Sequence, residues 1–159
     1  MMKVRDVGER ELISRIHRLQ AIIPFGYLGI GDDSAYLPPS TEGWLVSQDM
    51  LVEGIHFRWD WTNPEQLGEK AVAVNISDIA AMGGIPKAIL TSISLPGEMD
   101  IDVVEALYRG IAKGLDRYGV ALVGGDTVGS AQGLSLDVTA LGVPSVAQRP
   151  ILRRGARPG

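Results

Sequence analysis

The chain has 159 residues, of which 45% are hydrophobic and 21% charged, and its formal net charge at pH 7 is −4. This length predicts one domain with a substantial core, and the scattered basic residues argue against nucleic acid as a partner. The chain contains no cysteine, which excludes disulfides, thiolate metal sites and cysteine nucleophiles. Since the sequence has neither a signal-like segment nor a long apolar run, we expect a cytoplasmic protein without a membrane partner.

The first half of the chain predicts helices and strands in alternation. Residues 9–19 have the apolar spacing of an amphipathic helix. Residues 44–47 are typical of a strand that places Asp49 at its end. Asn63 is a typical helix N-cap residue, and a helical pattern follows it over 64–82.

The second half continues this alternation. Residues 87–95 predict a buried strand, and 101–118 a helix that Gly119 ends. Strands are then expected over 120–123 and 134–143. The order of elements predicts an α+β or α/β fold, in which helices pack on one face of a mixed sheet.

Four short segments each place a carboxylate beside glycine or apolar residues. Poorly solvated carboxylates repel one another unless a cation holds them together, so the segments predict a site for several metal ions. Oxygen ligands favour magnesium, and magnesium favours phosphate chemistry. The segments are Gly29-Ile-Gly-Asp-Asp33, Gln48-Asp-Met-Leu-Val-Glu53, Asn75-Ile-Ser-Asp78 and Gly124-Gly-Asp-Thr127.

The segment that contains Asp78 belongs to a helical pattern that is apolar almost all round, which predicts a helix buried between other elements. Asn75 and Asp78 are three residues apart and share one face of this helix. A carboxylate buried there must be hydrogen-bonded, paired or bound to metal. Pairing with Lys70 or Lys87, or capping of a neighbouring loop, is the structural alternative to a metal.

Each of the other segments also has an ordinary structural interpretation. Asp32 and Asp33 follow glycines, as in many turns. The segment 124–127 is equally typical of a plain tight turn and of a turn that binds phosphate or metal. A single histidine beside an aromatic residue, as at His56, is more often a surface or core residue than a ligand.

The sequence contains no phosphate-binding loop of the Walker type, no protein-kinase signature and no nucleophile elbow. Phosphoryl transfer needs positioning and charge neutralisation more than covalent catalysis. If the acceptor is itself a phosphate, its oxygen is already an anionic nucleophile. We therefore predict no catalytic side chain in the narrow sense.

Taken together and in order, the segments closely resemble the thiamine-monophosphate kinase family, which belongs to the wider group typified by aminoimidazole ribonucleotide synthetase. The resemblance rests on Gly29-Ile-Gly-Asp-Asp-Ser-Ala35, Asp49-Met-Leu-Val-Glu-Gly-Ile-His-Phe57, Asn75-Ile-Ser-Asp-Ile-Ala-Ala-Met-Gly83 and Gly124-Gly-Asp-Thr127. It implies ATP-dependent phosphorylation of thiamine monophosphate to thiamine diphosphate by direct transfer, with several Mg²⁺ ions.

The resemblance also implies roles for individual residues. Gln48 stands where the family usually has a hydroxyl residue, although an amide oxygen can also bind a metal. The implied magnesium ligands are Asp33, Ser47, Gln48, Asp49, Asp78 and Asp126. The implied contact with thiamine monophosphate is His56. The implied contacts with ATP are Gly125, Asp126, Arg153 and Tyr108.

The family has a second domain of about the same size, so the resemblance implies that residues 1–150 form an N-terminal ATP- and magnesium-binding domain and that 151–159 begin a linker. On this basis we expect these residues alone to be inactive. The family pairs the sheets of two copies, which predicts a homodimer, and the strands over 87–95 and 134–143 are apolar enough to be covered on both faces.

Two alternatives of other kinds stay open. A related ATP-using enzyme of purine or selenium metabolism would share the acidic segments, but the absence of cysteine argues against the selenophosphate type, and His56 with Phe57 argues against the purine type. A dimerisation or metal-binding module that keeps only the fold is the non-catalytic alternative.

Overall fold

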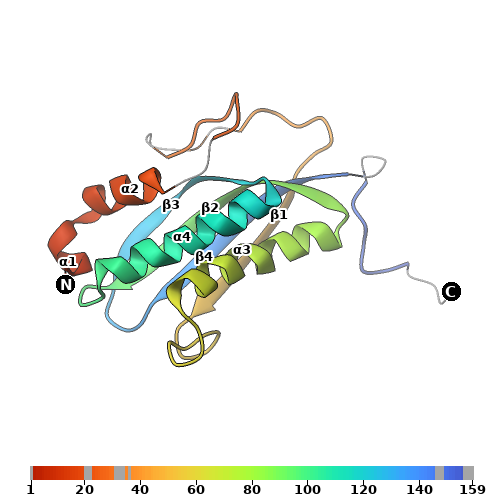
Figure 1. Ribbon diagram of the computed structural model, residues 1–159. Helices are drawn as coiled ribbons and strands as arrows, with labels where there is room; N and C mark the ends of the chain where they lie inside the picture. Colours follow the sequence, from red (N-terminus) through yellow and green to blue (C-terminus); the bar gives the residue numbers. More distant parts are fainter. Residues whose placement is uncertain (1, 20–22, 31–34, 36, 146–148, 156–159) are drawn as a thin grey trace.

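The computed structural model describes residues 2–19, 23–30, 35, 37–145 and 149–155. Its helices and strands follow the predicted order, with a short additional helix, α1, near the N-terminus (Figure 1). In chain order the elements are α1 (Val4–Val7), α2 (Glu9–Arg18), β1 (Leu45–Val52), α3 (Pro64–Ala81), β2 (Gly84–Pro96), α4 (Ile101–Tyr118), β3 (Ala121–Ser130) and β4 (Ser135–Pro144).

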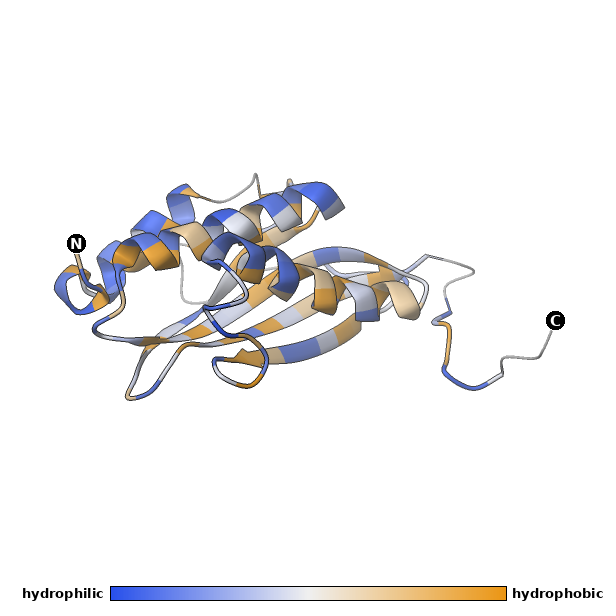
Figure 2. Ribbon diagram, turned by 60° about the horizontal axis from the view of Figure 1, so that its bottom comes forward, coloured by the Kyte–Doolittle hydropathy of each residue, from blue (hydrophilic) through white to orange (hydrophobic). Residues whose placement is uncertain are grey.

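The four strands form one mixed sheet in the order β1-β4-β2-β3, which confirms the predicted fold class. β4 is antiparallel to both of its neighbours, and β2 is parallel to β3. Helices α3 and α4 lie side by side on one face of this sheet (Figure 1). Figure 2 shows the other face of the strands turned away from both helices.

The ends of the two long helices follow their local sequence. Asn63 caps α3, because its side chain accepts a hydrogen bond from the Gln66 backbone N–H at 2.9 Å and the Gln66 side chain accepts one from the Asn63 N–H at 3.1 Å. Gly119 ends α4 in the left-handed conformation, with φ of 65°. Both boundaries were predicted from the sequence and are confirmed.

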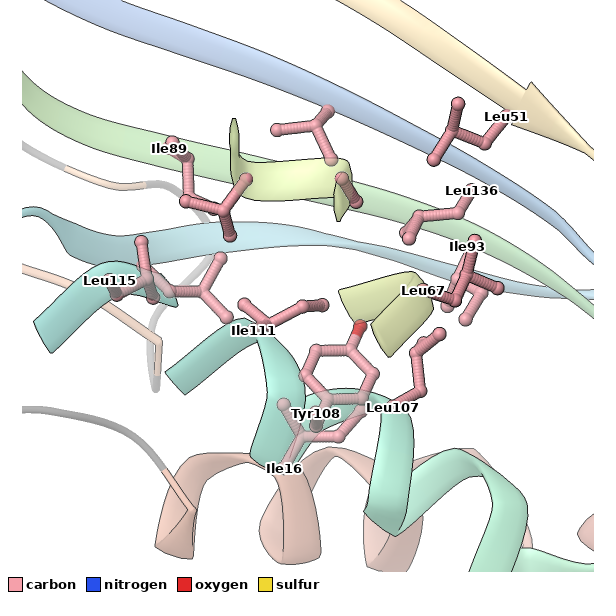
Figure 3. Packing of buried hydrophobic residues seen from close by; sticks show 14 of the residues in the cluster. Ile16, Leu51, Leu67, Ile89, Ile93, Leu107, Tyr108, Ile111, Leu115 and Leu136 are labelled. Carbon is pink, nitrogen blue, oxygen red and sulfur yellow. The ribbon is translucent and has the colours of Figure 1, made fainter. Parts of the chain in front are cut away.

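The core lies between the sheet and the helices. Leu67 of α3 and Leu107 and Ile111 of α4 meet Ile93 and Leu136 of the sheet there (Figure 3). Along β4 the side chains alternate between fully buried and half-buried. On the face away from the helices, Leu141 of this strand packs against a small second cluster that includes Ala88 and Val123. Coverage of both faces was expected in a dimer, so it stays a prediction for this strand.

Within the described part of the chain, every helix is too short or too polar to cross a membrane.

Candidate functional site

A cavity of about 900 Å³ lies between α2, α4 and the edge strand β3. We call it the β3 cavity, and its lining includes Arg10 of α2, Gly29 and Ile30 of the following segment, Thr91 of β2, Tyr108 of α4 and residues 124–127 of β3. Three of the residues implied to contact ATP, namely Tyr108, Gly125 and Asp126, therefore lie at one cavity. Sequence reasoning missed Arg10 and Thr91, because neither belongs to a recognisable motif.

The segment 124–127 is part of β3 and is paired with β2, so the prediction of a turn there was wrong. Gly125 lies opposite Thr91 in the parallel ladder, just after a register shift at Ile89 and Leu90. A Cβ at Gly125 would collide with the Thr91 carbonyl oxygen. The two backbones thus approach one another closely, and the cavity wall at Gly124 and Gly125 is bare backbone, which a phosphate group can approach.

Tyr108 forms part of the cavity wall from within the core. Its side chain is 3% exposed, and its hydroxyl lies 3.2 Å from Thr91 Oγ1. Figure 3 shows its ring among apolar side chains of α2 and α4, including Ile16 and Leu107. Burial raises the pKa of Tyr108 to about 12, against a smaller opposing effect of the Thr91 hydroxyl. The phenol therefore stays neutral at physiological pH.

Asp126 is exposed at the mouth of the β3 cavity. Its Oδ1 atom accepts a hydrogen bond from the Thr127 N–H at 2.8 Å, which holds the carboxylate near the strand backbone. Glu9 and Arg10 of α2 also line the cavity, so carboxylates and one guanidinium face the same space. This arrangement suits a phosphate that is accompanied by a cation.

The three candidate ligands on β1 are divided between the two faces of the sheet. Successive side chains of a strand alternate, so Ser47 and Asp49 share the helix side, where the Ser47 hydroxyl lies 3.4 Å from the Asn75 carbonyl oxygen and donates to it. Gln48 lies on the opposite face, where its amide donates to Asp137 at 2.9 and 3.0 Å. In this structure the amide group of Gln48 is thus engaged with a neighbouring carboxylate.

Asp78 is exposed, which corrects the expectation of a buried carboxylate on α3. The helix buries only the side that faces the sheet and α4, and Asp78 lies outside it. Among the described residues Asp78 has no ion pair with Lys70 or Lys87. Its neighbour Asn75 is the buried polar residue of this helix, 1% exposed, and its Nδ2 donates to the Ala71 carbonyl at 3.0 Å.

The remaining candidates lie elsewhere. His56 is exposed in the turn that follows β1. Arg153 is exposed in the segment beyond β4 and does not line the β3 cavity. Asp33 lies outside the described residues.

The donor set fits magnesium chemically but is not gathered in one place. Ser47, Asp49 and Asp78 lie at the β1 edge with α3, whereas Asp126 lies at the β3 edge. Three strand spacings separate the two edges, which amounts to about 14 Å. Considering only the described residues, no three histidine or carboxylate side chains lie close enough to hold one metal ion. Oxygen donors are the ligands that Mg²⁺ prefers, and the described residues at either edge supply too few of them to hold an ion alone.

Comparison with known proteins shows the family that the chain resembles. The family model "AIR synthase related protein, N-terminal domain" matches residues 31–144. A thiamine-monophosphate kinase of Bacillus subtilis is 44% identical over 116 residues, which cover 72% of this chain and 36% of that protein. The thiamine-monophosphate kinase of Corynebacterium glutamicum is 41% identical over 159 residues, which cover 98% of this chain and 46% of that protein. The resemblance predicted from the motifs is therefore confirmed.

A solved structure, AaThiL complexed with AMPPCP and TMP, superimposes with a TM-score of 0.68 at 33% identity. The match covers 99% of this chain and 48% of that one. The chain thus spans about half the length, or less, of the relatives that it matches.

Proposed function

The chain belongs to the AIR synthase related proteins, whose N-terminal domain it matches over residues 31–144, and we propose that it is the nucleotide-binding half of a thiamine-monophosphate kinase. An oxygen of the substrate's phosphate attacks the γ-phosphorus of ATP. The new P–O bond forms as the bond to the β–γ bridging oxygen breaks, which yields thiamine diphosphate and ADP. The observation that carries this proposal is the β3 cavity, which combines the bare backbone of Gly124 and Gly125 with Asp126.

In this proposal the β3 cavity receives the phosphates of ATP beside Gly125 and Asp126, with Tyr108 in the wall and Arg153 approaching from the segment beyond β4. His56 contacts the phosphate of thiamine monophosphate. The magnesium ligands come from Asp33, Ser47, Gln48, Asp49, Asp78 and Asp126. When bound, Mg²⁺ neutralises phosphate charge. The chain's own residues position the nucleotide and keep its phosphates against backbone.

The residues for the two substrates lie at opposite edges of the sheet. The β3 cavity is at one edge and His56 follows the strand at the other, about 14 Å away by strand spacing. Direct transfer needs the reacting atoms within about 3.5 Å. We therefore propose that the site is completed between two chains of a homodimer, and that residues 1–150 also act with a second domain reached through 151–159. The proposed place of action is the cytoplasm.

The open face of the sheet supports the proposed dimer, because apolar side chains there are exposed. Val46 is 63% exposed, Met50 51% and Val128 51%. We expect sedimentation velocity at micromolar concentration to show a dimer, and Met50→Lys to shift the protein toward monomer, because a buried unpaired ammonium is costly. Arg109→Lys, on the helix side, serves as the control. A monomeric wild-type protein would contradict the dimer.

The function is tested with a chimera, in which this chain is joined to the C-terminal part of the Corynebacterium glutamicum relative that the match leaves uncovered. We expect the chimera to convert thiamine monophosphate to thiamine diphosphate with ATP and Mg²⁺, measured by chromatography. Asp126→Asn should lower the rate by about 100-fold, in line with the loss of one electrostatic contact to a reacting phosphate. Asp116→Asn, an exposed acid of α4, should leave it unchanged.

If the chimera fails to fold, a calorimetric titration of this chain with MgATP still tests the proposed nucleotide site. Binding that Asp126→Asn weakens supports the nucleotide site. No binding in this titration, together with an inactive but folded chimera, rejects the proposed kinase. A folded chimera that hydrolyses ATP and leaves thiamine monophosphate unchanged favours another ATP-using enzyme of the same fold.

A further inference from the structure

The turn of residues 53–57, which we call the His56 turn, is held by its own backbone. The Gly54 N–H donates to the Phe57 carbonyl at 2.8 Å, and Glu53 forms a β-bridge with Phe57. Gly54 has a φ of 80°, a left-handed conformation that favours glycine. Phe57 is 1% exposed and packs edge-to-face on Trp59, with 5.1 Å between the ring centroids. The turn is therefore anchored in the core at its end.

His56 is hydrogen-bonded to the backbone of β1, the strand at one edge of the sheet. The Val52 N–H donates to His56 Nδ1 at 3.1 Å, and the His56 N–H donates to the Val52 carbonyl at 2.8 Å. A nitrogen that accepts a hydrogen bond carries no proton, so Nδ1 is the acceptor of a neutral ring and the proton lies on Nε2. The contact thus selects one tautomer and directs Nε2–H away from the strand.

Lys70 holds the same residue from the neighbouring helix. Its Nζ atom donates to the His56 carbonyl oxygen at 2.8 Å. Lys70 lies on α3, whose N-terminal half is fixed to α4 by close packing at Gly68. Within the described part of the chain, three of the four polar groups of His56 have a hydrogen-bond partner, and Nε2–H has none.

Glu53 holds the other side of the turn. Its Oε2 atom accepts a hydrogen bond from the Leu134 N–H at 2.8 Å, and its own N–H donates to the Leu134 carbonyl at 3.0 Å. Gly133 packs on the same side chain, since a Cβ there would lie 3.2 Å from Glu53 Oε2. The carboxylate therefore ties the His56 turn to the β3–β4 connection rather than facing open solvent.

We infer that Glu53 and Lys70 are positioning residues, which hold the His56 turn so that Nε2–H is presented to a phosphate oxygen of the substrate. The inference rests on the proposed function for the identity of the substrate. A neutral donor of fixed direction binds an anionic oxygen without a rearrangement of the ring, and the Lys70 ammonium adds positive potential beside it. Neither residue needs to touch the substrate for this role.

The tautomer can be tested without any substrate. The chain has two histidines, His17 and His56, so a ¹⁵N-histidine-labelled sample with His17→Gln assigns the ring resonances of His56. We expect two-bond ¹H–¹⁵N spectra to show the Nε2–H form. Lys70→Met and Glu53→Ala should each produce a mixture of tautomers, because the turn loses one of its supports.

Conservative variants separate positioning from folding. Lys70→Arg and Glu53→Gln keep a donor and an acceptor, respectively, and should restore the wild-type tautomer. Lys113→Met is the matched control, since this exposed lysine of α4 pairs with Glu69 of α3 at 2.7 Å. Circular dichroism and thermal unfolding establish that each variant is folded. A wild-type Nδ1–H form, or an unchanged tautomer in both Lys70→Met and Glu53→Ala, overturns the inference.

Kinetics of the chimera test the consequence for the substrate. Lys70→Met should raise KM for thiamine monophosphate about 5-fold or more, with kcat within about twofold and KM for ATP unchanged, because a ground-state contact is weakened. Lys70→Arg should reverse most of this change. A mixed tautomer with an unchanged KM supports the positioning role and counts instead against His56 as the substrate contact of the proposed function.

Discussion

Replacing Gly110 by alanine is expected to lower the free energy of unfolding by about 3 kcal/mol, although alanine forms helices better than glycine. A Cβ at Gly110 would overlap the backbone carbonyl of Glu65 on α3 and lie 2.8 Å from its Cα. A Cβ at Gly68 would likewise overlap the Leu107 carbonyl and lie 2.6 Å from the Ile111 nitrogen. Backbone atoms cannot move aside as a side chain can, so the two helices would have to separate.

Gly114 of the same helix offers the matched control. The three atoms nearest to a Cβ at Gly114 are Val72 Cβ, Cγ1 and Cγ2, at 3.0, 3.3 and 3.3 Å, so a shift of a few tenths of an ångström relieves the contact. Gly114→Ala should therefore change the free energy of unfolding by less than about 1 kcal/mol. Urea unfolding followed by circular dichroism measures both variants. An unchanged or increased stability of Gly110→Ala would show that α3 and α4 are not packed backbone to backbone.

Phe57→Ala is the second substitution with a large expected effect, a loss of about 3–5 kcal/mol of stability. The side chain is among the largest that are fully buried, and its removal leaves a cavity beside Trp59 that the fixed turn cannot fill. The same change should free His56, because Phe57 anchors the end of the His56 turn. We expect the two-bond ¹H–¹⁵N spectra of His56 to show a mixture of tautomers in place of the single Nε2–H form.

Trp61→Ala is the control for that substitution. Trp61 is 63% exposed, and its visible contact is with the guanidinium of Arg58, 5.3 Å from the ring centroid. Its removal should cost less than about 1 kcal/mol and leave the tautomer of His56 unchanged. Equal losses of unfolding free energy in Phe57→Ala and Trp61→Ala would contradict the assignment of Phe57 as the anchor of the turn.

The order of elements and the ends of the long helices could be predicted because their signals are local. Asn63 followed by Pro64 and the glycine after Tyr118 act within one helical turn, and each is found at the helix boundary. Strand lengths were less predictable. β3 continues through Gly124, Gly125 and Asp126, residues with weak strand preference, because pairing with β2 holds them in the ladder.

Burial of the acidic residues was beyond local reasoning. The helix of Asp78 is apolar almost all round, so its sequence does not say which side faces the sheet. The exposure of the Asp78 carboxylate therefore follows only from the packing of the helix. Gln48 is a different case. Once β1 is known to extend through residues 47–49, the alternation of side chains along a strand places Gln48 on the opposite face of the sheet from Ser47 and Asp49.

The sequence by itself determined the chain's family and the residue types of its site, because motifs such as Gly124-Gly-Asp-Thr127 keep their identity whatever surrounds them. Only the tertiary structure decided where those residues meet. Strand order places β1 and β3 at opposite edges of the sheet, so Asp49 and Asp126 are far apart in one chain. It likewise brought Lys70 and Glu53 to His56, since these contacts join a helix and a strand connection that are distant in sequence. Such contacts depend on the packing of segments that are distant in sequence, so a local sequence pattern does not predict them.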